Sequence, residues 1–229
     1  MTRPNRNTHV SIDSIHRCGQ HLLFELQPIV NAVNTEVLGF EFLFRGQHPD
    51  CWLDVDAALL SYLARPRNLP RVFVNLSNQG LMEHTVGQFM TASRANNVIF
   101  EISESVNEYA QRDLIAEKVN ALIASGVSVA LDDFGAGRDS LERLYSLDQP
   151  TAVKIDRAFL LTCMRREDAG STLRHMIEQW RANGILSIAE GVETAAVLEF
   201  ARSVGADLVQ GWHIDGLMAQ AEPVQRYAR

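Results

Sequence analysis

The segment Ala121–Gly135 reads ALIASGVSVALDDFG, and its pattern decides the fold class. It begins at the end of an amphipathic run, passes through Gly126 into the apolar stretch Val127–Asp132, and closes on a pair of aspartates. Glycine often follows a helix because the residue past the helix end adopts a left-handed conformation. A short apolar run between turn residues favours a buried strand. The segment therefore predicts a helix, a tight turn and a strand that ends in carboxylates.

The same order recurs along the chain. Gly184 and Gly205 also follow amphipathic runs and precede apolar ones, and Leu173–Trp180 has the spacing of a helix with one buried face. The candidate strands are Leu23–Val30, Val37–Phe44, Arg71–Asn75, Val98–Ile102, Val127–Asp132, Ala152–Asp156, Ile185–Glu190 and Asp207–Gln210. Strands alternating with helices in this number predict an α/β fold, a TIM (β/α)8 barrel.

The start of the barrel departs from the regular pattern. Only Asn31–Glu36 separates the first two strands, and such a segment is too short for a helical crossover. These strands should form a hairpin, which makes the barrel a modified one with an antiparallel first strand. Residues 1–20 are polar and are expected to be a loosely ordered lead-in to a single domain over residues 21–229.

Composition excludes several classes of protein. The 229 residues carry a net charge of -7, which argues against binding to a DNA or RNA polymer. Cys18, Cys51 and Cys163 show no CxxC spacing and favour a reducing compartment, so we expect a cytoplasmic protein. No apolar run approaches the ~18 residues of a membrane span, and the N-terminus has no secretory h-region.

Polar residues stand at or near the carboxyl ends of the candidate strands. They are Glu41, Asn75, Glu101, Asp132, Asp133, Lys154, Glu190 and Gln210. Barrel active sites lie at this end, so the side chains should converge on one axial pocket. Any one of them alone has a plainer interpretation, such as a turn residue or a solvent-facing acid. Together they bring carboxylates into one pocket, which is costly without a cation.

The cation is expected to be a metal. Carboxylate and amide oxygens suit Mg²⁺, Mn²⁺ or Ca²⁺ better than zinc. Five carboxylates exceed what one Mg²⁺ takes from a protein, and paired metals about 3.5–4 Å apart are typical of phosphoester hydrolysis. Lys154 is expected to position the attacking water or to neutralise a phosphate oxygen; its alternative interpretation is a buried structural ion pair. Gly135 and Gly137 indicate a mobile loop beside the aspartates, or an ordinary turn.

These residues resemble the EAL domain family of bacterial cyclic di-GMP phosphodiesterases. Glu41–Arg45 (EFLFR) is similar to the Glu-Ala-Leu signature, which is followed after one residue by arginine. The further matching motifs are QPIV at Gln27–Val30, VNLS at Val74–Ser77, EISE at Glu101–Glu104, DDFG at Asp132–Gly135, KID at Lys154–Asp156, AEGVET at Ala189–Thr194 and QG at Gln210–Gly211. The resemblance runs from about Leu23 to about Gly216.

The resemblance implies a modified TIM barrel that hydrolyses cyclic di-GMP to linear pGpG with two Mg²⁺ or Mn²⁺ ions. It implies that one metal is held by Glu41, Asn75, Glu101 and Asp132, and that Asp132 and Asp133 reach the second. Glu190 becomes the general-base candidate, assisted by Lys154. The implied substrate-binding residues are Gln27, Arg45, Asp156, Glu193 and Gln210. Glu104 would anchor the loop after the fifth strand, near which family members form a homodimer.

The chain also departs from the family pattern. Phe42 replaces the alanine of the signature, and Ala136, Arg138 and Asp139 replace the residues usual in the loop. The segment between Arg45 and Asn75 is shorter than in typical members. Two alternatives therefore stay open beside the phosphodiesterase: a non-catalytic cyclic di-GMP receptor or protein-binding regulator, and a different barrel hydrolase with a similar metal site.

Overall fold

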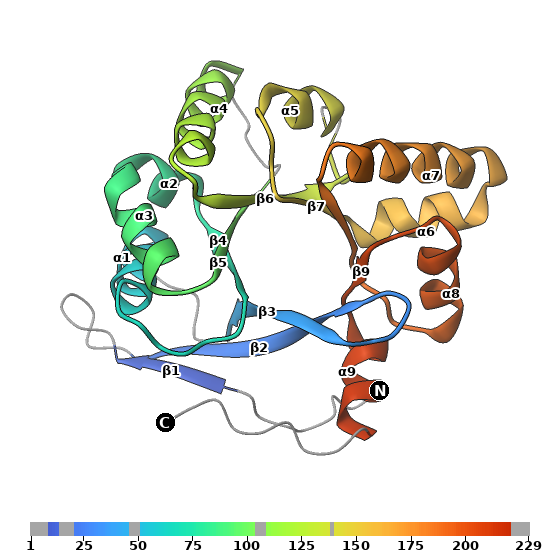
Figure 1. Ribbon diagram of the computed structural model, residues 1–229, viewed down its shortest axis with the longest axis horizontal. Helices are drawn as coiled ribbons and strands as arrows, with labels where there is room; N and C mark the ends of the chain where they lie inside the picture. Colours follow the sequence, from blue (N-terminus) through green and yellow to red (C-terminus); the bar gives the residue numbers. More distant parts are fainter. Residues whose placement is uncertain (1–8, 14–20, 46–50, 104–108, 138–139, 221–229) are drawn as a thin grey trace.

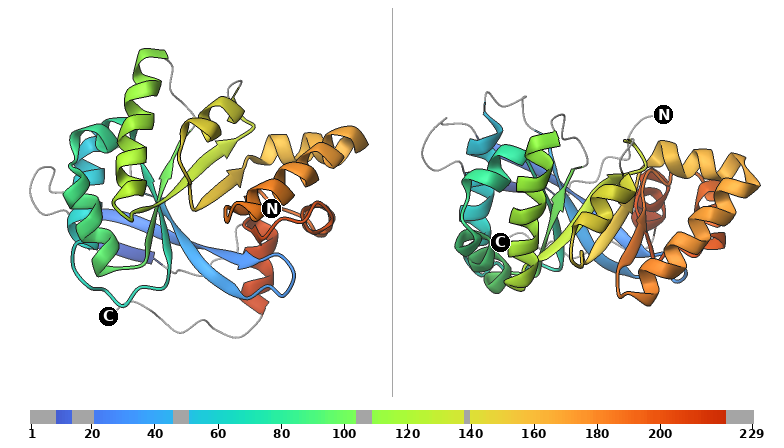
Figure 2. Two further views of the ribbon diagram at one scale, coloured as in Figure 1. Left: turned by 45° about the horizontal axis from the view of Figure 1, so that its top comes forward. Right: turned by 90° about the horizontal axis from the view of Figure 1, so that it is seen from above.

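The structure is a computed structural model that describes residues 9–13, 21–45, 51–103, 109–137 and 140–220. Its strands form one continuous sheet in chain order, β1 to β9, and a further pairing between β2 and β9 closes strands β2–β9 into a barrel. The helices surround the barrel (Figure 1), and Figure 2 shows the same arrangement from two further directions. The predicted TIM-like barrel is confirmed.

The elements alternate as the sequence pattern predicts. The strands are β1 His9–Asp13, β2 His21–Asn31, β3 Val37–Phe44, β4 Val72–Leu76, β5 Val98–Ile102, β6 Ser128–Phe134, β7 Ala152–Ile155, β8 Leu186–Ala189 and β9 Leu208–Val209. The helices are α1 Trp52–Leu63, α2 Asn78–Glu83, α3 Val86–Ala95, α4 Tyr109–Ala124, α5 Ser140–Ser146, α6 Arg157–Arg165, α7 Glu167–Ala182, α8 Ala195–Ser203 and α9 Trp212–Gln220.

The hairpin at the start of the barrel is also confirmed. β2 pairs antiparallel with β3, and Gln27 lies opposite Glu41 in that register. β2 also pairs antiparallel with β9, through Val30 opposite Val209. The other neighbours in the barrel, from β3 to β9, pair in parallel. One antiparallel strand therefore closes an otherwise parallel barrel.

The structure describes one stretch of the polar lead-in. Residues 1–20 are expected from the sequence to be loosely ordered, and within them residues 9–13 form β1, which pairs antiparallel with β2, with His9 opposite Glu25. The reason lies in the length of β2, which has 11 residues while β9 has 2. β9 covers only the end of β2 at Val30 and Asn31, so the backbone groups at the other end of β2 are left for β1 to satisfy.

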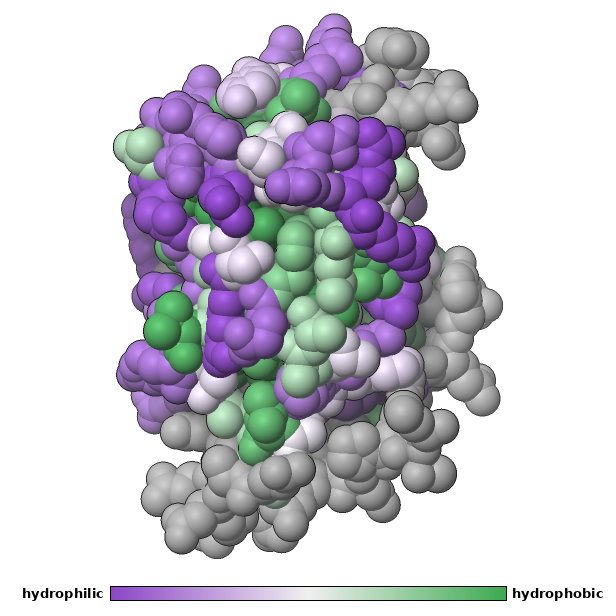
Figure 3. Space-filling view, turned by 90° about the vertical axis from the view of Figure 1, so that its right-hand side faces the viewer, coloured by the Kyte–Doolittle hydropathy of each residue, from purple (hydrophilic) through white to green (hydrophobic). Residues whose placement is uncertain are grey.

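The helices pack through the faces that their periodicity predicts. In α7, Leu173, Ile177 and Trp180 are buried. In α4, Ile115, Val119 and Leu122 are buried, whereas Leu114 is 53% exposed. The side of the molecule that carries α6 to α9 shows mostly hydrophilic side chains, with hydrophobic ones between them (Figure 3). None of the helices in the described residues is long and apolar enough to cross a membrane.

Candidate active site

A plug of apolar side chains fills the barrel and supports the candidate site. The plug consists of Ile29, Phe73, Ile99, Ala130, Ala152, Ile188 and Leu208. Side chains two residues apart on a strand point to the same face. Each plug residue on a parallel strand is therefore followed, two positions later, by an inward polar residue: Asn75, Glu101, Asp132, Lys154, Glu190 or Gln210. On the antiparallel β2 the order is reversed, and Gln27 precedes Ile29.

Glycine replaces the apolar plug residue on β3. Gly39 stands two positions before Glu41, and a Cβ there would lie 2.7 Å from the Arg71 carbonyl oxygen and 3.3 Å from the Phe73 ring. The missing side chain lets β4 approach β3 closely, and the bulky Phe73 fills the interior in its place. Every strand of the barrel except β3 thus contributes one apolar side chain to the plug, and each strand, β3 included, contributes one polar side chain above it.

Lys154 is the centre of the polar layer. Its Nζ lies 2.7 Å from Glu101 Oε1, 2.8 Å from Glu190 Oε1, 3.2 Å from Asp132 Oδ1 and 3.4 Å from Glu41 Oε2. The side chain is 1% exposed. Lys118 and Lys154 are the only lysines of the chain, which otherwise uses arginine. The four carboxylates around one ammonium group define what we call the acidic ring: Glu41, Glu101, Asp132 and Glu190.

Amide side chains continue the acidic ring on the side of β2. Asn75 Nδ2 donates to Glu41 Oε1 over 2.6 Å, and Gln210 Nε2 donates to Glu41 Oε2 over 2.5 Å. Gln210 Nε2 also donates to Gln27 Oε1 over 2.9 Å. Gln27 Nε2 in turn donates to Asp215 Oδ2 in α9, again over 2.9 Å. Glu41 therefore has a hydrogen-bond donor on each oxygen.

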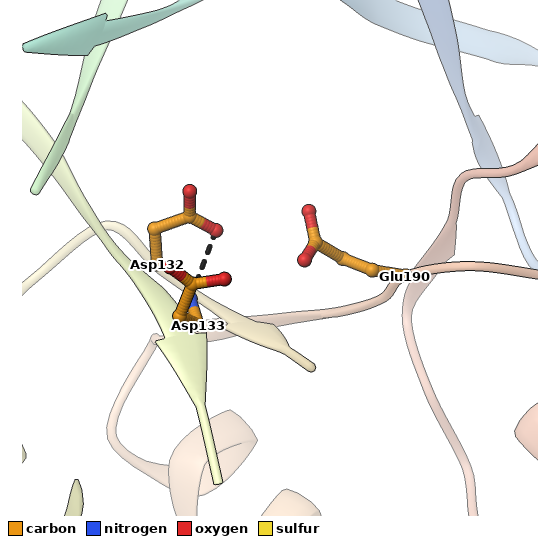
Figure 4. Close-up of side chains that lie close together, drawn as sticks. All are labelled: Asp132, Asp133 and Glu190. Carbon is orange, nitrogen blue, oxygen red and sulfur yellow. Dashed lines mark hydrogen bonds between the residues drawn. The ribbon is translucent and has the colours of Figure 1, made fainter. Parts of the chain in front are cut away.

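The aspartate pair lies across from Glu190. The side chains of Asp132, Asp133 and Glu190 point toward one another (Figure 4), and one carboxylate oxygen of each lies within 4.8 Å of the others. Asp133 has a φ of 58°, which is unusual for a residue with a side chain. Its backbone N–H donates to Asp132 Oδ1 over 2.9 Å, and Ser103 Oγ donates to Asp133 Oδ2 over 3.3 Å. This conformation brings two consecutive side chains of one strand end to the same site.

Burial and charge divide the acids into two groups. Burial alone would raise the pKa of Glu41, but the charge of Lys154 and the hydrogen bonds from Gln210 and Asn75 outweigh it and lower that pKa. Burial and the charge of Glu41 raise the pKa of Glu101 well above its ordinary value, against the opposing charge of Lys154. Burial would lower the pKa of Lys154, yet the surrounding carboxylates raise it well above its usual range.

Glu190 and Asp133 hold protons more tightly than ordinary acids do. Burial, opposed by the charge of Lys154 and reinforced by that of Asp132, raises the pKa of Glu190 to about 8. Burial and the neighbouring charges of Asp132 and Asp156 raise the pKa of Asp133. A group with a pKa near neutrality is suited to accept and return protons during a reaction. The site thus contains an acid–base candidate beside Glu41, whose lowered pKa keeps that carboxylate charged at neutral pH.

The acidic ring has the chemistry of a divalent-metal site. One lysine charge opposes the ring and Asp133, so the site carries an excess of negative charge that a cation would relieve. Glu101 is fully buried, and no hydrogen-bond donor within the described residues reaches its Oε2. Oxygen donors of this kind suit Mg²⁺, Mn²⁺ or Ca²⁺. The residues present therefore fit the metal that the sequence predicts.

The residues expected to bind substrate are only partly assembled with the ring. Gln27 and Gln210 join it directly, whereas Arg45 forms an ion pair with Glu25 over 2.7 Å. The Asp156 carboxylate accepts from the Phe159 N–H over 3.0 Å and caps α6. Its charge still acts on Asp133, so Asp156 borders the site.

Glu193 also has a partner outside the ring. It accepts from Arg157 Nη2 over 2.8 Å, and within the described residues no hydrogen bond or ion pair joins it to the acidic ring. Glu104, Arg138 and Asp139 lie outside the described residues.

Two acids in or near the site were not predicted from the sequence. Asp215 lies in the first turn of α9 and belongs to the amide chain that reaches Glu41. Asp56 in α1 is 2% exposed and accepts from Ser77 Oγ over 2.5 Å, beneath the end of β4. Neither residue belongs to a strand end or to a recognisable motif. The clue for Asp56 was its place in a helix whose neighbours, such as Val55 and Leu59, are apolar.

Comparison with known proteins identifies the family. Residues 54–216, more than half of the chain, match the EAL domain. The chain is 27% identical to the bifunctional diguanylate cyclase/cyclic di-GMP phosphodiesterase MucR of Pseudomonas aeruginosa over 91% of its length, and 27% identical to the probable cyclic di-GMP phosphodiesterase PdeB of Escherichia coli over 89%. It spans 35% and 43% of those relatives.

Solved structures agree with this assignment. BlrP1 of Klebsiella pneumoniae, solved at pH 6 as a manganese/cy-diGMP complex, matches with a TM-score of 0.69 and 25% identity. That match covers 89% of this chain and 58% of the other. The barrel with its antiparallel strand, the acidic ring and the match over residues 54–216 lead to one conclusion. The chain belongs to the EAL domain family, whose relatives include cyclic di-GMP phosphodiesterases.

Proposed function

We propose that this protein hydrolyses cyclic di-GMP to linear pGpG in a reaction that depends on Mg²⁺ or Mn²⁺. The observation that carries the proposal is the acidic ring, in which four carboxylates surround Lys154. A fifth carboxylate, that of Asp133, lies close to Asp132 and Glu190 of the ring. Carboxylates in this number at the mouth of a barrel suit a pair of divalent ions better than a structural ion pair. The named activities of MucR and PdeB agree with the proposal.

Two sets of residues are proposed to hold the metals. Glu41, Asn75, Glu101 and Asp132 would hold one ion, and Asp132 with Asp133 would hold the second. When bound, such ions polarise a phosphodiester and favour deprotonation of water. The Asn75 side chain would need to turn its oxygen toward the ion, because its nitrogen now donates to Glu41.

Glu190 and Lys154 are proposed to manage the proton. Glu190, with a pKa of about 8, would accept a proton from the attacking water and return one to the leaving oxygen. Lys154, 2.8 Å from Glu190 Oε1, would hold that carboxylate in place and stabilise the negative charge that develops on phosphate. The ammonium group thus serves as both an orienting and an electrostatic group.

The remaining residues are proposed to bind the nucleotide: Gln27, Arg45, Asp156, Glu193 and Gln210. Arg45 would exchange its Glu25 partner for a substrate phosphate, and Glu193 would contact substrate from its place beside Arg157. Glu104 would anchor the loop after β6, through which two copies of the chain would also pair. The short segment between Arg45 and Asn75 keeps a second candidate function open, a receptor that binds cyclic di-GMP without turnover.

The test compares two glutamate substitutions in purified protein with Mn²⁺ and cyclic di-GMP. Wild type is expected to release pGpG, and Glu41→Ala to lose that activity by at least ~100-fold because a ligand is removed. Glu36→Ala, at an exposed position in the turn before β3, is the matched control and should retain full activity. Binding of cyclic di-GMP without pGpG release would support the receptor instead. Equal activity in both variants would overturn the assignment of Glu41.

A further inference from the structure

Asp215 lies on a helix outside the barrel strands, yet it is connected to the inner layer of the site. Its Oδ2 accepts from Gln27 Nε2 over 2.9 Å, and Gln27 Oε1 accepts from Gln210 Nε2 over the same distance. Gln210 Nε2 also donates to Glu41 Oε2 over 2.5 Å. A chain of two amides, which we call the amide relay, therefore joins the Asp215 carboxylate to the Glu41 carboxylate.

The amide relay has a direction, and Asp215 sets it. An amide has an N–H donor end and a carbonyl acceptor end, whereas an ionised carboxylate only accepts. Asp215 must therefore face the Nε2 end of Gln27, which turns the Gln27 oxygen toward Gln210. Gln210 must then present its own Nε2, and that donor group also reaches Glu41. With Gln27 reversed, its oxygen would face the Asp215 carboxylate and its N–H groups would face those of Gln210.

The amide orientation in this relay leaves one polar atom of Gln210 unsatisfied. Its Oε1 is buried and meets no hydrogen-bond donor within the described residues. A buried acceptor without a partner is unfavourable, so Gln210 alone has no reason to prefer this orientation. The orientation is held instead by the acceptors that its Nε2 reaches, Gln27 Oε1 and Glu41 Oε2. Without Asp215, the Gln27 side-chain amide is free to exchange the positions of its oxygen and nitrogen. Gln210 Nε2 then keeps Glu41 Oε2 as its one fixed acceptor.

We propose that Asp215 is a positioning residue that fixes the amide direction of Gln27 and thereby holds a donor of Gln210 on the Glu41 carboxylate. The inference rests on the proposed function, because it matters only if Glu41 is a metal ligand. Groups that hold a metal ligand in orientation tune metal affinity even without touching the ion. A plainer role for Asp215 is a negative charge in the first turn of α9, where it interacts favourably with the helix dipole.

Two substitutions separate these roles. Asp215→Asn removes the charge but keeps an oxygen that can accept from Gln27, whereas Asp215→Ala removes both. If the relay operates, Asp215→Asn should bind Mn²⁺ within about 2-fold of wild type in calorimetry. Asp215→Ala should bind Mn²⁺ about 10-fold more weakly, which is the low end of the effect for groups that hold a metal ligand in place. Equal weakening in Asp215→Asn and Asp215→Ala would assign the effect to charge and overturn the proposal. Wild-type affinity in both would overturn it as well.

A double-mutant cycle tests whether Asp215 acts through Gln27. Gln27→Leu breaks the relay from its other side, so adding Asp215→Ala should leave the Mn²⁺ affinity unchanged. A further loss in the double variant would overturn the proposal, because Asp215 would then act by another route. Gln27→Leu also supplies a folded probe if Asp215→Ala does not fold, since it should weaken Mn²⁺ binding to the same extent.

A measurement without metal separates failure of this inference from failure of the proposed function. The side-chain amide signals of Gln27 and Gln210 can be followed by NMR in the metal-free protein. Asp215→Ala should shift the Gln210 signals and Asp215→Asn should leave them near their wild-type positions. Unchanged Gln210 signals in Asp215→Ala would overturn the relay even if the protein hydrolyses cyclic di-GMP. Absence of Mn²⁺ binding by wild type would overturn the proposed function.

Discussion

Replacing Lys154 by methionine removes the one cation that the structure places among the four carboxylates. Methionine has similar length and fits an apolar environment, so the change deletes charge with little loss of volume. The lysine side chain is 1% exposed, and four carboxylate oxygens lie between 2.7 and 3.4 Å from its Nζ. In the metal-free protein nothing else within the described residues balances these charges.

The size of the effect follows from burial. Removing one partner of a buried ion pair costs about 3–5 kcal/mol of the free energy of unfolding, because the other charge is left uncompensated. We expect a loss of that size for Lys154→Met in the presence of a chelator at neutral pH. A bound divalent ion would replace the missing charge, so Mn²⁺ should stabilise the variant more than it stabilises wild type. A ligand at 100 times its Kd stabilises by about 2.7 kcal/mol.

The assay is urea unfolding followed by circular dichroism, with chelator or with Mn²⁺. Lys118→Met is the matched control, because Lys118 is the only other lysine and donates to the His84 carbonyl oxygen over 2.7 Å. Loss of that hydrogen bond from a charged donor should cost about 1.5–3 kcal/mol, with or without metal. If Lys154→Met in chelator is no less stable than Lys118→Met, the carboxylates are not charged around the lysine. The electrostatic account of the site would then be wrong.

Three further substitutions test separate parts of the structure. Burial, opposed by hydrogen bonds from Ser77, raises the pKa of Asp56 from 3.8 to about 6. Because the folded state then binds a proton more tightly than the unfolded state, Asp56 should increase the free energy of unfolding of wild type as pH falls from about 6 toward 4, by up to about 3 kcal/mol. Because Glu190, Glu101 and Asp133 also have raised pKa values, Asp56→Asn should lose only the Asp56 share of this dependence in urea unfolding at several pH values, and an unchanged slope would contradict the assignment. Gly39→Ala should cost about 1–3 kcal/mol, since its Cβ would press on backbone near Phe73, and wild-type stability would argue against the close approach of β3 and β4. Glu190→Gln should lower kcat for cyclic di-GMP by about 100- to 10,000-fold with little change in KM; wild-type kcat would exclude Glu190 as the base.

The sequence predicts much of the barrel because one regularity governs both core and site. A strand places every second residue inward, so the apolar residue that fills the barrel and the polar residue above it are linked, as Ile99 is to Glu101 and Ala152 to Lys154. Strand ends therefore reveal the acidic ring without knowledge of contacts. The hairpin Asn31–Glu36 is equally predictable, because its length forbids a crossover.

The features that sequence does not reveal depend on partners far away in the chain. Gln27 and Asp215 meet across 188 positions, and nothing local to either residue indicates the other. The Arg45–Glu25 ion pair is of the same kind, since it depends on the register of β2 against β3. β1 escapes prediction for a different reason. Its pairing is decided by the free backbone edge that the long β2 leaves beside the short β9.

The measurement that tests the central claim most directly is the release of pGpG from cyclic di-GMP as a function of Mn²⁺ concentration. Wild-type protein freed of metal should release none, and the rate should rise and saturate over the range in which calorimetry detects Mn²⁺ binding. The same dependence with Mg²⁺ would follow from the oxygen-rich ligand set. A metal-saturated, folded wild-type protein that leaves cyclic di-GMP intact would contradict the claim that the acidic ring is a catalytic metal site.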